Sequence, residues 1–260
     1  MGKSIAAIVA VFRLTRAHTA VVAGIVAYAL SPGGTGAVLA SAALALLLAG
    51  AFAFNDVCDR EADAINVPAR PIPSGVLSLP TVVAIVVLCS AGALASAFAA
   101  KSVRVVALTC ALVILLFVYS LLLKRITFVK NLVMALVGAS VPLFGSLSQE
   151  ARAIAIAIGL FILQKEIVAD AYDRDGDVRV GLRTLPVLFG IRRTMGMIAA
   201  INAAFLGCAV WMRSGPLIAV GIVNIAAAIV TALHGDRAVK GMLTLQKVFL
   251  LAGLLFAWRT

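Results

Sequence analysis

Long apolar runs separated by short polar segments follow one another along almost the whole chain. A helix needs about 20 mostly apolar residues to cross the hydrocarbon core of a bilayer. The pattern therefore predicts nine membrane-spanning helices, at residues 9–30, 37–56, 81–99, 103–123, 128–147, 153–173, 194–212, 215–233 and 242–258. Several connections, such as residues 31–34 and 213–216, are so short that successive helices must run antiparallel. We expect an all-α membrane protein, residues 1–260 forming one domain around a central cavity.

Composition excludes the soluble classes. Of the 260 residues, 63% are hydrophobic and 13% are charged, whereas soluble domains average roughly 45–50% and 25%. The net charge of +11 does not indicate a nucleic-acid partner, because the predicted loops on the N-terminal side hold about three times as many Lys and Arg residues as the other side. By the positive-inside rule, the N-terminus is cytoplasmic and the C-terminus lies outside, in the cell membrane.

Acidic residues gather at two places, each at the cytoplasmic end of a predicted span. Nine of the 11 fall in two short stretches, which are Asp56, Asp59, Glu61 and Asp63, and Glu166, Asp170, Asp173, Asp175 and Asp177. Residues four apart, or three and four apart in turn, share one face of a helix. On that spacing we define a first stripe, Asn55, Asp59 and Asp63, and a second stripe, Glu166, Asp170, Asp173 and Asp177. Asp56 and Asp175 are expected to lie off these faces.

Carboxylates crowded in a stripe repel one another, so a counter-charge is expected. Mg²⁺ typically bridges one or two carboxylates to the phosphates of a substrate. The alternative is a solvated helix end with compensating arginines. Each stripe is followed by a loop with an Arg and a Pro, which predicts a pseudo-repeat with halves at about 1–123 and 124–260 facing one cavity.

Basic residues on the same side suit an anion, namely Arg70, Lys124, Arg125, Lys130 and Arg183. A lysine at the membrane interface can also extend its amine towards water, which is the alternative for Lys124. Metal ions and basic side chains around a diphosphate would stabilise it as a leaving group. The apolar interior suits a long hydrocarbon tail. An allylic isoprenyl diphosphate combines both parts.

Four motifs resemble the UbiA superfamily of intramembrane prenyltransferases: Asn55-Asp56-x-x-Asp59-x-x-x-Asp63, Arg70-Pro71-Ile72-Pro73-Ser74-Gly75, Tyr119-Ser120 with Lys124, and Asp170-x-x-Asp173-x-x-x-Asp177. The resemblance implies a nine-helix bundle that binds two Mg²⁺ ions and a prenyl diphosphate. One ion would be held by Asn55, Asp59 and Asp63, the other by Asp170, Asp173 and Asp177. Arg70 and Lys124 would hold the diphosphate, and Tyr119 would lie near the allylic carbon. Glu166 extends the second stripe by one turn and would support it.

The first predicted span departs from the quinone-pathway members, which often carry Arg-Pro-x-Asn where this chain has Arg16-Ala17-His18-Thr19. This segment is expected to face the acceptor, and His18 is either a base or hydrogen-bond donor, or structural. The run from Lys165 to Pro186 is most similar to digeranylgeranylglyceryl phosphate synthases, which implies geranylgeranyl diphosphate as donor and geranylgeranylglyceryl phosphate as acceptor in ether-lipid biosynthesis. The phosphate of that acceptor would need another cation, from Arg13, Arg16, Arg179 or Lys130.

Three other functions remain open. The acceptor could be an aromatic quinone precursor of the 4-hydroxybenzoate, dihydroxynaphthoate or homogentisate type. A terpene cyclase on the same scaffold would release diphosphate without any acceptor. A transporter is the third alternative, because acids within membrane proteins often mark ion pathways, although its acids are expected near the bilayer midplane rather than at helix ends.

Overall fold

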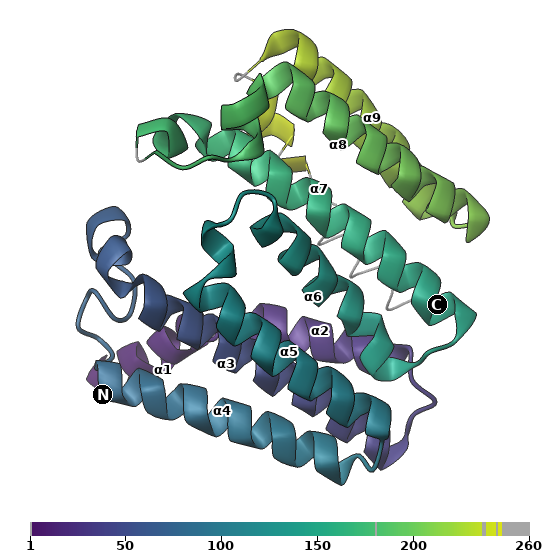
Figure 1. Ribbon diagram of the computed structural model, residues 1–260. Helices are drawn as coiled ribbons and strands as arrows, with labels where there is room; N and C mark the ends of the chain where they lie inside the picture. Colours follow the sequence, from purple (N-terminus) through teal and green to yellow (C-terminus); the bar gives the residue numbers. More distant parts are fainter. Residues whose placement is uncertain (1, 180, 236–237, 243, 246–260) are drawn as a thin grey trace. The chain divides into compact units, whose positions relative to one another are not determined.

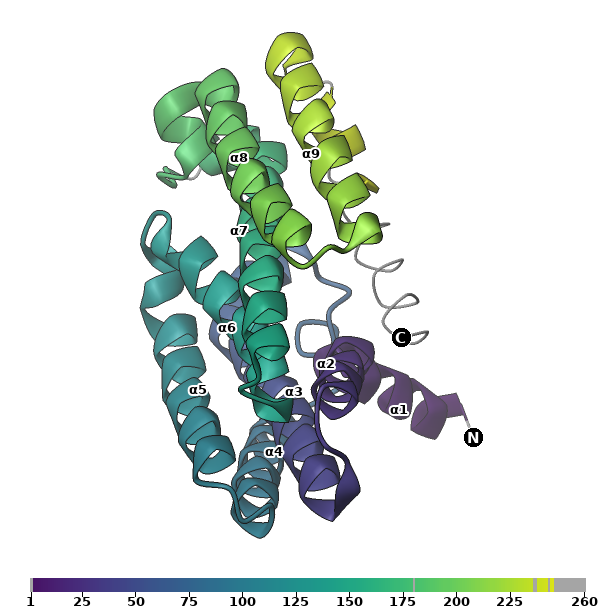
Figure 2. The same cartoon turned by 90° about the vertical axis from the view of Figure 1, so that its right-hand side faces the viewer.

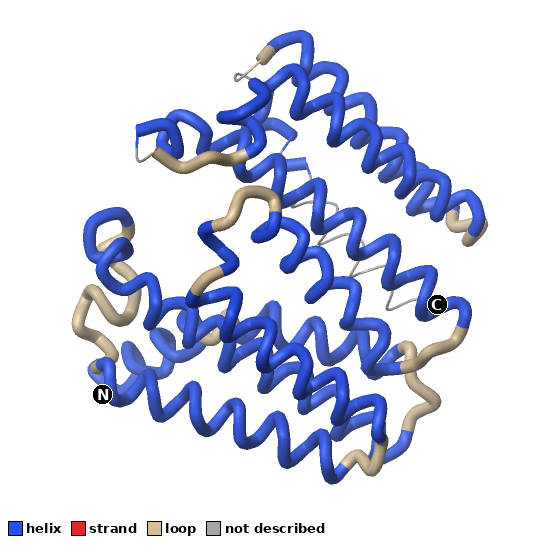
Figure 3. Tube along the Cα trace, in the orientation of Figure 1, coloured by secondary structure: helices blue, strands red, loops and turns tan. Residues whose placement is uncertain are grey.

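The computed structural model describes residues 2–179, 181–235, 238–242 and 244–245 (Figures 1 and 3), and within these ranges the chain is helical, with no strand. The helices are α1 (Gly2–Leu14), α2 (Ala17–Ala29), α3 (Gly34–Asn66), α4 (Leu79–Ala99), α5 (Val103–Leu121), the 3₁₀ turn η1 (Leu123–Arg125), α6 (Val129–Gly145), α7 (Gln149–Arg179), α8 (Leu185–Trp211) and α9 (Gly215–His234). The all-α prediction is confirmed.

The chain divides into two compact units. The first comprises the residues up to Lys124 together with 140–146, and the second comprises 125–139 and the described residues from 147 onward. In the first unit α3 packs against α2, α4 and α5, and α4 also packs against α5. In the second unit α7, α8 and α9 pack side by side in chain order (Figure 2). The pseudo-repeat stays a prediction.

Length and composition identify fewer spans than nine. Among the described residues, five helices are long and apolar enough to cross a membrane, and six if the bent pair α1–α2 forms one span. These five are α3, α4, α5, α8 and α9. Helix α6 is shorter, with 17 residues, and α7 carries Lys165, Glu166 and Asp170 within its apolar part. The predicted span 242–258 lies outside the described residues except at 242, 244 and 245.

One predicted span is interrupted, and the helix that contains another is broken before that span begins. The run 9–30 bends by 55° between α1 and α2, where Arg16 adopts a left-handed conformation with φ 44° and ψ 48°. Helix α8 begins at Leu185, well before the predicted start at 194, and contains a break at Gly190 with φ 75°. A positive φ is easily adopted by glycine but costs a residue with a side chain about 1 kcal/mol. Arg16 therefore needs compensating contacts.

Two other helices extend beyond their predicted spans. Helix α3 runs to Asn66 and α7 runs to Arg179, so each acidic stripe lies on one continuous helix, as the spacing predicted. Buried apolar residues pack beside both stripes. In the first unit Leu14 and Ala53 belong to one core cluster, and in the second unit Ile167 and Val168 belong to another. These cores hold the helix that carries each stripe in a defined rotation.

One close helix contact yields a stability prediction. A Cβ atom at Gly145, the last residue of α6, would overlap the carbonyl oxygen of Ala27, which belongs to the backbone and cannot rotate away. We expect Gly145→Ala to lower the free energy of unfolding by about 1–3 kcal/mol through overpacking. Gly207 in α8 has open space around the same position, so Gly207→Ala should be neutral or stabilise by up to about 1 kcal/mol. Equal melting temperatures of the two purified variants in detergent would contradict the close contact.

Candidate active site

The first stripe lies on the C-terminal part of α3, and its side chains bind one another and a lysine. Asn55 Nδ2 donates a hydrogen bond to Asp59 Oδ2 at 2.8 Å. Lys124, in the turn η1 after α5, places its Nζ 2.5 Å from Asp59 Oδ1. Only 16% of the Lys124 side chain is exposed. Lys124 therefore points at the stripe.

Arg70 comes from the loop after α3 and turns back onto that helix. Its Nη1 donates to Asp63 Oδ2 at 2.5 Å and to Asp56 Oδ1 at 3.2 Å, and both carboxylates are buried. Asp56 was expected to lie off the face of the stripe, and it nevertheless shares Arg70 with Asp63. Successive residues of a helix are rotated by about 100°, so positions seven apart differ by only about 20°. Asp56 and Asp63 consequently face the same guanidinium.

The charges around the first stripe balance. Arg16 Nη2 lies 4.0 Å from Asp56 Oδ1, and the Arg16 guanidinium carbon lies 4.6 Å from the centroid of the Phe52 ring. Arg16, Arg70 and Lys124 thus face Asp56, Asp59 and Asp63. The compensating cations that the sequence left as an alternative are present here. Their N–H groups line the stripe and can also bind an anion.

The second stripe, on α7, is only partly compensated. Asp170 is buried and accepts hydrogen bonds from Lys130 Nζ at 2.7 Å and Asn131 Nδ2 at 3.0 Å. Glu166 pairs with its neighbour Lys165 at 2.6 Å. Among the residues that the structure describes, no lysine or arginine forms an ion pair with Asp173 or Asp177. The carboxylates at the C-terminal end of this stripe are therefore not tied up in ion pairs with the described lysines and arginines.

The donors suit a Mg²⁺ ion that is shared with phosphate. Within the described part of the chain, no three His, Cys, Asp or Glu side chains converge into a ready-made metal cage. Mg²⁺ does not require one, because it commonly keeps several waters and takes one or two carboxylates plus phosphate oxygens. Asp173 and Asp177, four residues apart on α7, offer such a pair. Thr184 Oγ1 donates to Asp177 Oδ2 at 3.0 Å and leaves Oδ1 available.

The structure also describes the other residues that the sequence singled out. Tyr119, near the end of α5, is half-buried. Arg183 has an exposed side chain, and its carbonyl oxygen accepts a hydrogen bond from Thr127 Oγ1. Arg13 and His18 line a cavity of about 560 Å³ together with Ile8, Val9 and Phe12. Ile8, Val9 and Phe12 are each more than half exposed, so this cavity is an open hollow at the surface that combines apolar side chains with two polar ones.

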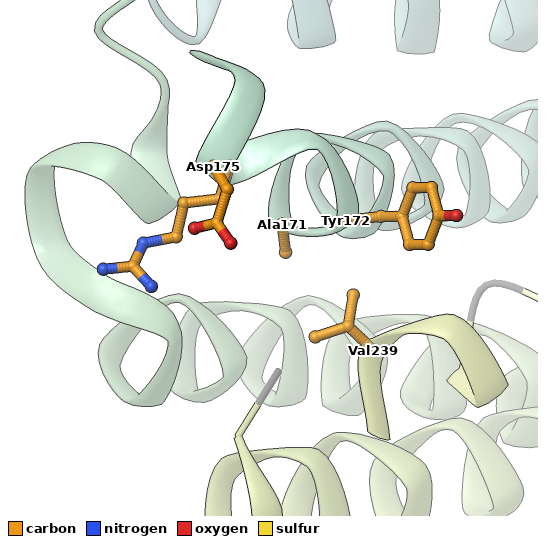
Figure 4. A pocket seen from close by; sticks show the side chains of 5 residues that line it. Ala171, Tyr172, Asp175 and Val239 are labelled. Atoms are coloured by element: carbon orange, nitrogen blue, oxygen red, sulfur yellow. The ribbon is translucent and has the colours of Figure 1, made fainter. Parts of the chain in front are cut away.

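Asp175 lines a second, smaller cavity. It has a volume of about 110 Å³ and is lined by Ala171, Tyr172, Arg174, Asp175 and Val239 (Figure 4). Asp175 contributes to this cavity, and none of the four residues of the second stripe does. The structure thus places Asp175 away from the stripe, in agreement with the helical spacing.

Sequence reasoning missed three residues that hold the site. Asn131 and Thr184 each donate a hydrogen bond to a carboxylate of the second stripe, and Asp56 holds Arg70. Asn131 is a polar residue at the start of an apolar run, next to Lys130, which was a signal that could have been used. Asp56 lies within the first quoted motif and Thr184 within the run from Lys165 to Pro186, but their partners depend on the folded loops.

The UbiA prenyltransferase family model matches residues 18–249. The chain belongs to this family. Digeranylgeranylglyceryl phosphate synthase of Methanoculleus marisnigri is 35% identical over 204 residues, which cover 71% of this chain and 70% of that protein. The Pyrococcus abyssi protein of the same name is 33% identical over 216 residues, covering 78% and 76%. The resemblance inferred from the motifs is confirmed, and the chain is a prenyltransferase and an integral membrane protein.

Two solved structures share the fold. A structure of digeranylgeranylglyceryl phosphate synthase superposes with a TM-score of 0.82 at 19% identity and covers 99% of this chain and 98% of that chain. A UbiA homologue from Archaeoglobus fulgidus, bound to GPP and Mg²⁺, superposes with a TM-score of 0.65 at 18% identity and covers 96% and 98%. At these identities the likeness shows the UbiA fold.

Proposed function

We propose that the chain transfers a geranylgeranyl group from geranylgeranyl diphosphate to geranylgeranylglyceryl phosphate, with Mg²⁺, in ether-lipid biosynthesis. The observation that carries the proposal is the pair of acidic stripes with their adjoining cations. Relatives named digeranylgeranylglyceryl phosphate synthase match more than two thirds of the chain, which favours this donor and acceptor. A structural relative that binds a prenyl diphosphate and Mg²⁺ supports the metal dependence.

In the proposed reaction the bond between the allylic carbon and the diphosphate oxygen breaks, and the diphosphate leaves with the electron pair. The acceptor hydroxyl oxygen then bonds to that carbon and loses its proton. Arg70 and Lys124 donate hydrogen bonds to the diphosphate oxygens and favour its departure. The ring of Tyr119 would stabilise the allylic cation. The paired motifs suggest two Mg²⁺ ions. One would be held by Asn55, Asp59 and Asp63, and the other by Asp170, Asp173 and Asp177. Both would neutralise the charge of the leaving group.

The cavity at the α1–α2 bend supports an acceptor with a phosphate and an alkyl chain. Ile8, Val9 and Phe12 offer an apolar wall, and Arg13 offers a permanent positive charge beside His18. We assign the acceptor chain to the apolar wall and its phosphate to Arg13, with Arg16, Arg179 or Lys130 as further cations. The distribution of basic residues favours a cytoplasmic N-terminus and a site that opens to the cytoplasm.

An acceptor panel tests the proposed function. Protein purified in detergent is incubated with Mg²⁺ and radiolabelled geranylgeranyl diphosphate, together with geranylgeranylglyceryl phosphate, 4-hydroxybenzoate, dihydroxynaphthoate or no acceptor. We expect label in the glycerophosphate lipid and none after EDTA treatment. Label in an aromatic product would show that the acceptor is a quinone precursor instead of the glycerophosphate lipid. Diphosphate release without acceptor would favour a cyclase. Absence of chemistry with every acceptor and donor length would overturn the enzymatic proposal in favour of transport.

A further inference from the structure

We propose that Asp56 is a positioning residue for prenyl transfer, because its buried carboxylate orients Arg70 for the diphosphate and anchors Arg16 at the α1–α2 break. The inference rests on the proposed function for the identity of the anion. Asp56 differs in role from Asp59 and Asp63, which the stripe assigns to metal binding. Its contacts are to two arginines from different segments of the first unit.

The hydrogen bonds of Arg70 leave the anion-binding side of its guanidinium available. Arginine has five N–H groups, and Arg70 uses the nitrogen Nη1 for both Asp56 and Asp63. The two carboxylates thus take the two N–H groups of Nη1 and define the plane of the guanidinium. The N–H groups of Nε and Nη2 remain, and a bidentate contact to a phosphate needs two.

Of the two carboxylates that bind Arg70, Asp56 is the one that keeps its contact when a metal ion is bound. If Asp63 turns towards a metal ion, as the first stripe predicts, its hold on Arg70 weakens. Asp56 is buried, with 7% of its surface exposed, and its Oδ1 lies between Arg70 and Arg16. A buried carboxylate with two cationic partners has little freedom to rotate. Arg70 therefore keeps its orientation when the diphosphate and its metals are bound.

The second partner links Asp56 to the segment that borders the acceptor cavity. Arg16 has the strained left-handed backbone at the break between α1 and α2, and its guanidinium rests on Phe52. Phe52 and Asp56 are four residues apart on α3 and so share one face. Arg13 and His18 flank this break and line the cavity. The Asp56 carboxylate thereby positions Arg70, which is proposed to bind the donor diphosphate, and the α1–α2 segment, which is proposed to bind the acceptor.

The test measures diphosphate binding separately from turnover. We expect Asp56→Asn to raise the KM for geranylgeranyl diphosphate and the Kd for inorganic diphosphate, measured with Mg²⁺ and without acceptor, by about tenfold each, with a smaller effect on kcat. Glu61→Gln is the matched control, because Glu61 lies on the same helix but is 85% exposed and pairs with Arg60. Diphosphate binding by this control should equal that of the unmodified protein.

A double-mutant cycle separates positioning from a structural role. If Asp56 acts through Arg70, Asp56→Asn should add little to the loss of diphosphate affinity in an Arg70→Lys background. Additive losses, or an unchanged diphosphate Kd in Asp56→Asn, would overturn the proposal. Should Asp56→Asn fail to fold, Asp56→Glu retains the charge with altered reach, and the same cycle with Arg70→Lys applies. Because the binding assay needs no acceptor, failure of the proposed acceptor would leave its result unaffected.

Discussion

Prenyl transfer should fall by at least about a thousandfold when Asp173 is replaced by Ala, a loss of about 4 kcal/mol of transition-state stabilisation. Asp173 is exposed and forms no ion pair with a described lysine or arginine, so its carboxylate is available for Mg²⁺ and diphosphate. Removing it takes away a carboxylate of the second stripe that is not engaged by an ion pair with a described lysine or arginine. Steady-state turnover of the purified variant with saturating donor and acceptor is the measurement.

The neighbouring acid Asp175 provides the control for Asp173. It lies on the same helix two residues further on and lines the small cavity instead of the stripe. Asp175→Ala should retain turnover within about threefold, since surface changes away from a site usually have small effects. The melting temperature of both variants should match that of the unmodified protein. Full activity of folded Asp173→Ala would contradict metal binding by the second stripe, and Asp59→Ala applies the same test to the first.

Replacing Lys124 with Met should raise the KM for the prenyl diphosphate by about 10- to 100-fold, because a charge-assisted contact to a phosphate contributes about 1.5–3 kcal/mol. Lys124 Nζ already lies against Asp59 at the first stripe, where the diphosphate is expected. Methionine keeps most of the length and apolar volume of the side chain and removes the charge. Donor titrations at fixed Mg²⁺ give the KM directly.

Lys101 is the matched lysine for this experiment. It precedes α5, whereas Lys124 follows it, and it is exposed. Lys101→Met removes the same charge at the opposite end of the helix, so donor KM should stay unchanged. Equal shifts in the two variants would show that net charge, rather than the contact at the stripe, governs donor binding.

The two stripes could be predicted because they depend on helical spacing alone. Asn55, Asp59 and Asp63 share one face of any straight α-helix, as do Asp170, Asp173 and Asp177. The partner of each carboxylate could not be predicted. Lys124 reaches Asp59 and Lys130 reaches Asp170 only because the turn after α5 and the start of α6 bring them to α3 and α7 respectively. A count of intervening residues does not define that geometry.

The role of Asp56 illustrates the same limit at a single residue. Because Asp56 directly follows Asn55, helical spacing predicted that it lies off the stripe. The loop that returns Arg70 to α3 decides which carboxylates Arg70 binds, and Asp56 is one of them. The break at Arg16 was likewise hidden within a single apolar run. Hydropathy records the length of a run but not the backbone angle at one residue, and a local left-handed conformation is stabilised by contacts from elsewhere in the fold.

By itself the sequence determined that this is a helical membrane protein with two acidic stripes on separate helices, because apolar length and 3.6-residue periodicity are properties of the chain. Tertiary structure decided which cations compensate which carboxylates. Arg16, Arg70 and Lys124 meet the first stripe and Asp56, while Asp173 and Asp177 form no ion pair with any described lysine or arginine. That difference arises from long-range contacts, since an ion pair requires two side chains within about 4 Å, whatever their separation along the chain.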